Sequence, residues 1–250
     1  MAIDIPFGCG TGLVKRDYKK NPSGYLGALA PRADDKLLID EAEWPDRLNE
    51  LNKSGTSLLH WRIAFIAFLK SLNQNPFGLC WAFSSTKALM YIRILMGLEP
   101  AILSAWYVAG MIKRWRDQGG WGAESLEFIA DTGVPLEEYC PSYSSKYDTA
   151  DTRANAALNK CTEWRDGTED PSYNTKLCVS SLLQTTPCIV DLNDMGHSMC
   201  AIHIGSLNPL EIIYDNSWGQ QGEDGLYRGR GARARPDGLV IPAVALPNRR

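Results

Sequence analysis

Hydrophobic positions in the first half of the chain recur at helical spacing. Between residues 44 and 133 the pattern is mostly helical, and the run that follows Cys80 contains no proline and ends in glycine. Gly133 stands where a C-capping glycine is expected. The pattern predicts an all-helical lobe with helices over residues 44–53, 58–72, 80–97, 104–118 and 124–133.

The second half of the chain changes to short apolar runs typical of strands. A polar stretch after Cys140 leads to five such runs, at residues 187–192, 197–205, 211–219, 225–229 and 239–246. Helices followed by strands predict an α+β chain with two segregated lobes and a cleft between them. We therefore expect an irregular N-terminal arm over 1–43, a helical lobe over 44–140 and a β-rich lobe over 141–250.

Composition and charge exclude several classes of protein. The chain has 250 residues, is 44% hydrophobic and carries a formal charge of −3, as expected for a folded protein with no general attraction to nucleic acid. The most apolar early segment, 58–72, is interrupted by charge and too short to span a bilayer, so we expect no membrane partner. The arginine-rich run over 228–235 is interpreted as a solvated loop.

The cysteines indicate reduced thiols and no metal. There are seven, with no C-x-x-C pair and no histidine at zinc-ligand spacing, so neither a structural zinc site nor another cofactor is expected. The N-terminus lacks the pattern of a secretory signal, which predicts an intracellular or particle-associated protein. Near it, FGCGTG over residues 7–12 lacks the register and the preceding strand of a phosphate-binding loop.

One cysteine stands at a helix entrance. Cys80 follows the turn-forming sequence QNPFGL and begins a long apolar run, so it is either a buried filler or a nucleophile. A helix N-terminus and an imidazolium can each lower the pKa of a thiol, which predicts rapid alkylation of Cys80 near pH 6.

Only three histidines, His60, His197 and His203, are available to activate that thiol. His60 is assigned to packing, and His203 lies roughly 20 Å along the strand from His197 at the usual rise, which makes it a poor partner. His197 opens a strand, and a hairpin places Asn216 on the neighbouring strand, where its amide can hold the imidazole.

Four sequence blocks, in the same order, resemble the papain-like cysteine peptidases. QNPFGLCWAF at residues 74–83 is similar to the family's Q-x-x-C-G-S-C-W-A-F, and NSWG at 216–219 is intact. Gly119–Gly120 resembles the family's glycine pair, and Gly196–His197–Ser198 its histidine strand. The four blocks bracket about 150 residues of the chain.

The resemblance implies a fold and a role for each site residue. The fold would be the papain-like two-lobed one, with a helical N-terminal lobe, an antiparallel β-barrel-like C-terminal lobe and the active-site cleft between them. The catalytic group would comprise the nucleophile, the base that later acts as acid, the residue that orients the imidazole and the oxyanion-hole donor: Cys80, His197, Asn216 and Gln74. Trp218 would shield the imidazole, and Gly119 and Gly120 would bind the substrate backbone.

The sequence also departs from the family pattern. Phe77 replaces a cysteine, Gly196 replaces Asp or Asn before the histidine, and one tryptophan after NSWG is missing. Cys80 and His197 are 117 positions apart, fewer than the roughly 130 to 150 usual for the family. No inhibitory propeptide is recognisable, which leaves open whether the N-terminal arm inhibits or is removed.

Three functions are compatible with these patterns. The first is a peptidase that cuts peptide or protein substrates through a Cys80 acyl-enzyme. The second is a structural or assembly protein, for example of a virus or phage particle, that retains the fold with little or no activity. The third uses the same residues to transfer the acyl group to an amine instead of water.

Overall fold

The computed structural model describes residues 9–15, 33–167 and 170–243. These residues form eight α-helices: α1 (Trp44–Ser54), α2 (Leu58–Ala64), α3 (Ile66–Leu69), α4 (Cys80–Leu95), α5 (Ala105–Lys113), α6 (Gly122–Asp131), α7 (Ala150–Ala156) and α8 (Pro171–Leu183). They also form six strands: β1 (Glu163–Asp166), β2 (Cys188–Leu192), β3 (His197–Leu207), β4 (Leu210–Asp215), β5 (Leu226–Arg230) and β6 (Gly238–Ala243). The α+β class predicted from the sequence is confirmed.

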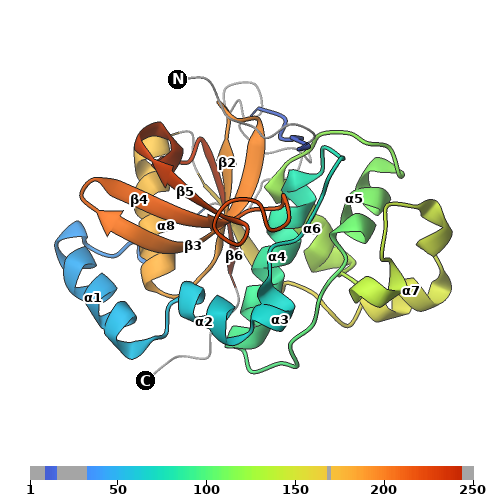
Figure 1. The fold of residues 1–250 in the computed structure, drawn as a ribbon, viewed down its shortest axis with the longest axis horizontal. Coiled ribbons are helices and arrows are strands. Elements are labelled where there is room, and N and C mark those ends of the chain that lie inside the picture. The colour runs from blue at the N-terminus through green and yellow to red at the C-terminus, as the bar shows by residue number, and fades with distance from the viewer. Residues whose placement is uncertain (1–8, 16–32, 168–169, 244–250) are drawn as a thin grey trace.

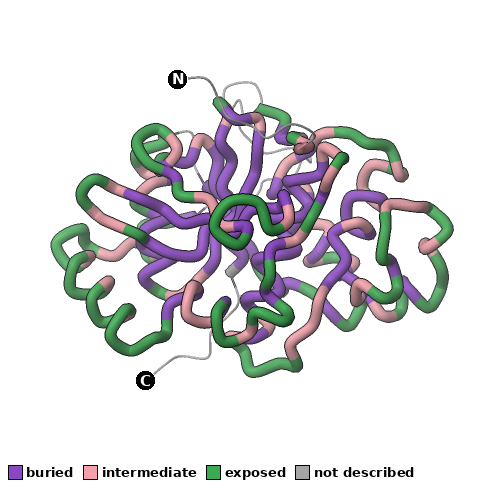
Figure 2. The backbone as a smooth tube through the Cα atoms, in the orientation of Figure 1, coloured by how far each residue is buried: buried purple, intermediate pink, exposed green. Residues whose placement is uncertain are grey.

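The strands form one antiparallel sheet in the order β1-β6-β2-β3-β4-β5, which is open at both edges. Helices α5, α6 and α7 lie on one side of α4, while the sheet and α8 lie on the other (Figure 1). Helix α1 packs against α8 on the sheet side. Figure 2 shows the buried backbone concentrated in α4 and the centre of the sheet, with exposed segments at the periphery. Among the described residues, no helix is long and apolar enough to cross a membrane.

Helix α4 is the central element of the molecule. Fourteen of its sixteen residues are buried, because β3 covers one side and α5 and α6 cover the other. A helix that is apolar on nearly all sides is expected in such a position. Several of its buried polar side chains are hydrogen-bonded; Ser85 Oγ, for example, donates to the carbonyl of Trp81 at 2.9 Å. The buried helix therefore provides a fixed support for the residue at its N-terminus.

One predicted helix is divided in the structure, and three further elements were not predicted. The expected helix over 58–72 is split into α2 and α3 at Phe65, whose φ of −117° and ψ of 35° depart from helical values. Helix α7 falls in sequence interpreted only as a polar stretch, and strand β1 and helix α8 fall in residues for which no element was predicted. In α8, Asp170 caps the N-terminus and Pro171 occupies the first turn, which are the start signals that could have predicted it.

Candidate active site

The entrance of α4 holds the candidate nucleophile. Cys80 is the first residue of the helix and is fully buried, and Leu79 before it has non-helical backbone angles. The turn that leads into the helix is fixed by Gln74, whose Nε2 donates to the carbonyl of Phe77 at 2.8 Å. The backbone N–H of Gln74 donates to the carbonyl of Ser217 at 2.9 Å. Sequence positions 74 and 217 are thereby joined across the two lobes.

The strands bring the candidate histidine and asparagine together. His197 begins β3, and Asn216 directly follows β4, which pairs with β3. The imidazole Nε2 and Asn216 Oδ1 lie 2.8 Å apart, and the indole of Trp218 stacks on the imidazole with ring centroids 4.4 Å apart. Nδ1 of His197 has no hydrogen-bond partner among the described residues. The imidazole is therefore oriented on one side and open to a reaction partner on the other.

The N-terminal arm segment, residues 9–15, lies in this site. Gln74 Nε2 and Trp218 Nε1 both donate to the carbonyl oxygen of Gly10 at 2.9 Å. The backbone N–H of Gly12 faces the Cys80 sulfur and lowers the thiol pKa. The arm segment thus engages the predicted oxyanion donor and covers the predicted nucleophile.

The same segment also occupies the predicted glycine track. Gly120 donates its N–H to the Gly12 carbonyl at 2.9 Å and accepts from the Val14 N–H at 3.2 Å, which makes a parallel bridge centred on Leu13. The Leu13 N–H donates to the carbonyl of Gly196 at 3.0 Å. The backbone of the arm segment therefore runs along a strip between Gly120 and Gly196.

Two glycines of FGCGTG make this close approach possible. An ideal Cβ atom on Gly10 would lie 1.9 Å from the Phe77 carbonyl oxygen, and one on Gly12 would lie 1.7 Å from that of Gly78. Both distances are far below any van der Waals contact, so only glycine fits at these positions. The sequence interpretation gave this motif no role. Its glycines let the arm segment lie directly against the turn that precedes Cys80.

Burial changes the ionisation expected of the cysteine and histidine. It raises the pKa of the Cys80 thiol to about 12, although the N–H groups of Ser198, Gly12 and Trp81 lower it. Burial lowers the pKa of His197 to about 4, against the raising effect of its bond to Asn216. The lowered thiol pKa predicted from the helix entrance is thus wrong for this closed arrangement. Desolvation outweighs the helix N-terminus, and the thiol and imidazole are both neutral at physiological pH.

Alkylation at different pH values tests this assignment. With a pKa near 12, roughly one thiol in 10⁵ is ionised at pH 7, so Cys80 is expected to react slowly with iodoacetamide. Its rate should rise throughout the range from pH 5 to pH 10, because the protonated form dominates below the pKa. Mass spectrometry measures the rate at each site, with half-buried Cys9 as the internal reference. A rate for Cys80 that is already fast and level near pH 6 would contradict the neutral pair.

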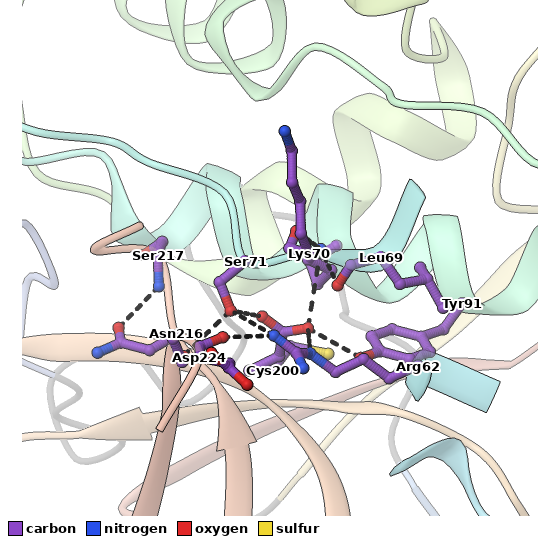
Figure 3. Close-up of polar contacts among 12 residues, drawn as sticks. Arg62, Leu69, Lys70, Ser71, Tyr91, Cys200, Asn216, Ser217 and Asp224 are labelled. Carbon is purple, nitrogen blue, oxygen red and sulfur yellow. Dashed lines mark hydrogen bonds and ion pairs between the residues drawn. The ribbon is translucent and has the colours of Figure 1, made fainter. Parts of the chain in front are cut away.

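A buried network of charges ties the helices to the sheet. Asp215, the last residue of β4, is 2% exposed and accepts hydrogen bonds from Ser71 Oγ at 2.6 Å and Tyr91 Oη at 2.8 Å. Arg62 Nε lies 3.4 Å and Lys87 Nζ 3.7 Å from the same carboxylate. Figure 3 shows Arg62, Ser71 and Tyr91 converging from the helical side, with Asn216 beside the network. Such a cluster is costly to break because its charges are desolvated.

The network connects both halves of the site. Asp215 directly precedes Asn216, which holds the imidazole, and Lys87 lies on α4, the helix that begins at Cys80. The same carboxylate therefore fixes the end of β4 against α4. We expect this contact to help set the separation of the imidazole and the thiol.

Removing the carboxylate is expected to destabilise the protein strongly. Asp215→Ala would leave Arg62 and Lys87 buried without their counter-charge, at a cost of about 3–5 kcal/mol in the free energy of unfolding. Urea denaturation measures the change. The matched control is Glu43→Ala, which removes an exposed helical pair with Arg47 and should cost about 0.5 kcal/mol or less. Equal effects for the two variants would refute a structural role for the network.

The structure places all seven sequence-predicted site residues around one strip of the molecule. His197 contacts both Asn216 and Trp218, and Gln74 and Gly120 contact the arm segment. An ideal Cβ atom on Gly119 would lie 2.7 Å from the Gly12 carbonyl oxygen, so the arm segment leaves no room for a side chain at this position either. Among the described residues, no cluster of metal-ligating side chains is present and all seven cysteines are unpaired.

Known proteins resemble the chain in sequence and in fold. No protein-family model matches it. Stem bromelain from Ananas comosus is 29% identical over 180 residues, which cover 62% of this chain and 80% of that protein. Among solved structures, xylellain, a cysteine protease from Xylella fastidiosa, superposes with a TM-score of 0.65 at 14% identity, covering 98% of this chain and 100% of the other.

Bromelain from Ananas comosus, solved in complex with the E64 inhibitor, superposes with a TM-score of 0.57 at 24% identity over 74% of this chain and 97% of the other. These proteins share the helical and antiparallel-sheet content predicted from the sequence. The resemblance to the papain-like cysteine peptidases is confirmed, and the chain has the papain-like fold.

Proposed function

We propose that the chain is a cysteine peptidase that hydrolyses peptide bonds through an acyl-enzyme on Cys80, with His197 as base and then acid. The observation that carries the proposal is the 2.8 Å contact between His197 Nε2 and Asn216 Oδ1. It leaves Nδ1 without a described partner, while the N–H of the next residue, Ser198, faces the Cys80 sulfur. Nucleophile, base and orienting amide thus lie in the order that this chemistry requires.

The proposed reaction has two stages. In the first, His197 takes the thiol proton, the Cys80 sulfur attacks the substrate carbonyl carbon, and the amine leaves with the proton returned from the imidazolium. In the second, His197 takes a proton from water, the hydroxide attacks the thioester, and the C–S bond breaks to release the carboxylic acid, while the imidazolium returns its proton to the sulfur and restores the thiol. Asn216 holds the ring so that the same nitrogen serves both stages.

The oxyanion would be held by Gln74 Nε2 and the backbone N–H of Cys80. In the present arrangement that Nε2 donates to the Gly10 carbonyl, which marks where a carbonyl oxygen binds. Hydrogen-bond donors of this kind are typically worth about 3–4 kcal/mol in the transition state. Gly119, Gly120 and Trp218 would contact the peptide on either side of the bond that is cut.

We infer that the described arrangement is a latent form. The arm segment covers Cys80, but its carbonyl at Gln74 belongs to Gly10, whereas the group facing the sulfur is the N–H of Gly12. While both contacts hold, the arm segment excludes a substrate from Gln74 and from the thiol. Displacement of the arm would rehydrate the thiol and imidazole and allow them to ionise.

The alternative of a structural or assembly protein is not favoured, because the similar proteins are cysteine proteases. Association with a larger particle has no support in the described structure. We further propose that the protein works where thiols stay reduced, either inside a cell or in a particle, in keeping with its unpaired cysteines.

Labelling with an epoxide inhibitor tests the proposed function. The purified full-length chain is incubated with E64, which binds bromelain in a similar solved structure, and the modified residue is mapped by mass spectrometry. Cleavage of a diverse peptide library is measured in parallel, with and without an added amine that would reveal acyl transfer. We expect modification at Cys80 and hydrolysis that the modification abolishes. A chain that neither reacts nor cleaves, even with the arm displaced, would overturn the proposal.

A further inference from the structure

An open hollow lies beside the candidate active site. It has a volume of about 480 Å³, and Leu72, Asn73 and Gly219 form part of its lining. These residues flank Gln74 and Trp218 in the chain. The Gly219 N–H donates to the Leu72 carbonyl at 2.9 Å, and Asn73 pairs with Trp218 in an antiparallel bridge. The hollow is therefore continuous with the residues that hold the oxyanion donor and the indole in place.

The other walls of the hollow are apolar and come from distant parts of the helical lobe. Phe68 of α3 forms one wall, and Ile102, Trp106 and Pro141 form another, with Ile102 just before α5 and Trp106 in its first turn. Trp106 packs edge-on against Phe83 of α4, with ring centroids 4.7 Å apart. Phe68 is 36% exposed, so part of its apolar surface is open to solvent. A concave site with apolar walls of this kind is suited to binding an apolar group.

The charges that line the hollow are balanced. One is the cation of Lys70 and the other the anion of Glu137. Lys70 is exposed, and Figure 3 shows its side chain directed away from the buried network around Ser71 and Tyr91. One charge of each sign gives the hollow no net preference for a charged group. Burial of apolar surface is then the main source of selectivity.

The path of the arm segment leads out of the cleft next to this hollow. The Gly10 N–H donates to Asn75 Oδ1 at 3.0 Å, and Cys9 Sγ lies 3.4 Å from Gln221 Oε1. Asn75 and Gln221 lie within two residues, along the chain, of positions that line the hollow. A peptide that leaves the cleft on this side therefore comes to the rim of the hollow.

The hollow lies on the leaving-group side of the cleft. Along the arm segment, the contact with Trp218 comes first, the contact with Cys80 second and the contact with Gly120 third. Trp218 and Gly120 are therefore on opposite sides of the thiol. Because His197 gives its proton to the leaving amine, the substrate residues after the cleaved bond pass the imidazole and the indole stacked on it.

We propose that this hollow binds a large apolar side chain of the substrate, leucine or phenylalanine, in the second or third residue after the cleaved bond. The inference rests on the proposed peptidase function. An extended peptide rises about 3.3 Å per residue, so the first residue after the bond lies near Trp218 and the next two reach the hollow. An apolar side chain gains from leaving water, whereas a polar side chain of the same shape also loses hydrogen bonds to water.

Internally quenched peptides that differ at one residue test the selectivity. They carry leucine or asparagine, which has nearly the same shape but a polar amide, at the second or the third residue after the cleaved bond. The full-length chain and Gly12→Val, whose new side chain displaces the arm segment, are both assayed. At one of the two positions kcat/KM for leucine is expected to exceed that for asparagine by roughly tenfold or more. Equal values at both positions, or higher values for asparagine, would overturn the inference.

Variants of one wall assign the selectivity to the hollow. Phe68→Ala removes apolar surface, so the leucine-to-asparagine ratio is expected to fall by roughly threefold or more, while Phe68→Leu should retain it. The control is Ile63→Ala, which removes a 65% exposed apolar side chain on α2, outside the hollow, and should leave the ratio unchanged. A general loss of structure would lower cleavage of both peptides alike. An unchanged ratio in folded Phe68→Ala would refute the assignment, and the wild-type comparison decides by itself if that variant does not fold.

The outcomes separate this inference from the proposed function. Failure of E64 to modify Cys80, with no cleavage of any peptide by either chain, would count against the peptidase itself. Modification of Cys80 and equal cleavage of the leucine and asparagine peptides would leave the peptidase standing and overturn only the role of the hollow.

Discussion

Cys80→Ala is expected to lower kcat for peptide hydrolysis by roughly 10⁵ to 10⁶, and His197→Ala by a similar factor. The physical reason is that the thiolate forms only if the imidazole accepts its proton, so removing either group removes the same step. The double variant should therefore be little worse than either single variant. Asn216→Ala should retain some activity, because the amide orients the ring through the 2.8 Å contact but takes no proton.

Steady-state kinetics on a peptide that the wild type cleaves provides the measurement, and circular dichroism checks that each variant is folded. Thr11→Val is a suitable control, since Thr11 is exposed on the arm segment and contacts none of the reacting groups. Two single variants whose effects multiply in the double variant would contradict a shared step. Near-normal activity in His197→Ala would require another base.

The sequence was informative where local pattern and fixed motif spacing agree. Helix α4 begins at Cys80 and ends at Leu95, as the unbroken apolar run predicted. The predicted hairpin likewise put Asn216 on the strand next to that of His197, where the two side chains are in contact. These contacts depend on strand pairing, which a period of two and short turns specify well. The same reasoning missed α8, because its residues are buried on most sides and show little helical periodicity.

The position of the arm segment could not be predicted from sequence. Its contacts are backbone hydrogen bonds to residues distant in the chain, such as Gly120 and Gly196, and backbone groups are the same for every sequence. The only local signal is the pair Gly10 and Gly12, which has many possible causes. The raised pKa of Cys80 was missed for the same reason. The sequence shows that the thiol stands at a helix entrance, but it does not show that the arm segment buries it.

Gly12→Val is expected to activate the enzyme by preventing the arm segment from occupying the site. Any Cβ atom at this position would lie about 1.7 Å from the Gly78 carbonyl oxygen, so the segment must withdraw from Cys80. If the closed form outweighs the open one by roughly 100 to 1, the rate of modification by E64 should rise by up to about 100-fold. The rise has that limit because the reactive fraction cannot exceed one.

The rate is followed by mass spectrometry at Cys80, with Thr11→Val as the matched change of one arm residue that leaves the glycines intact. A synthetic peptide of residues 9–15 added to Gly12→Val should restore protection, whereas the same peptide carrying valine in place of Gly12 should not.

The pH dependence of Cys80 alkylation should change as well, because loss of the covering arm segment lets the thiol ionise well below its closed-state pKa of about 12. Rapid alkylation near pH 6 would then be a property of Gly12→Val and not of the wild type. Equal labelling of the two chains at every pH would show that the arm segment does not limit access to Cys80, and that burial of the thiol has another cause.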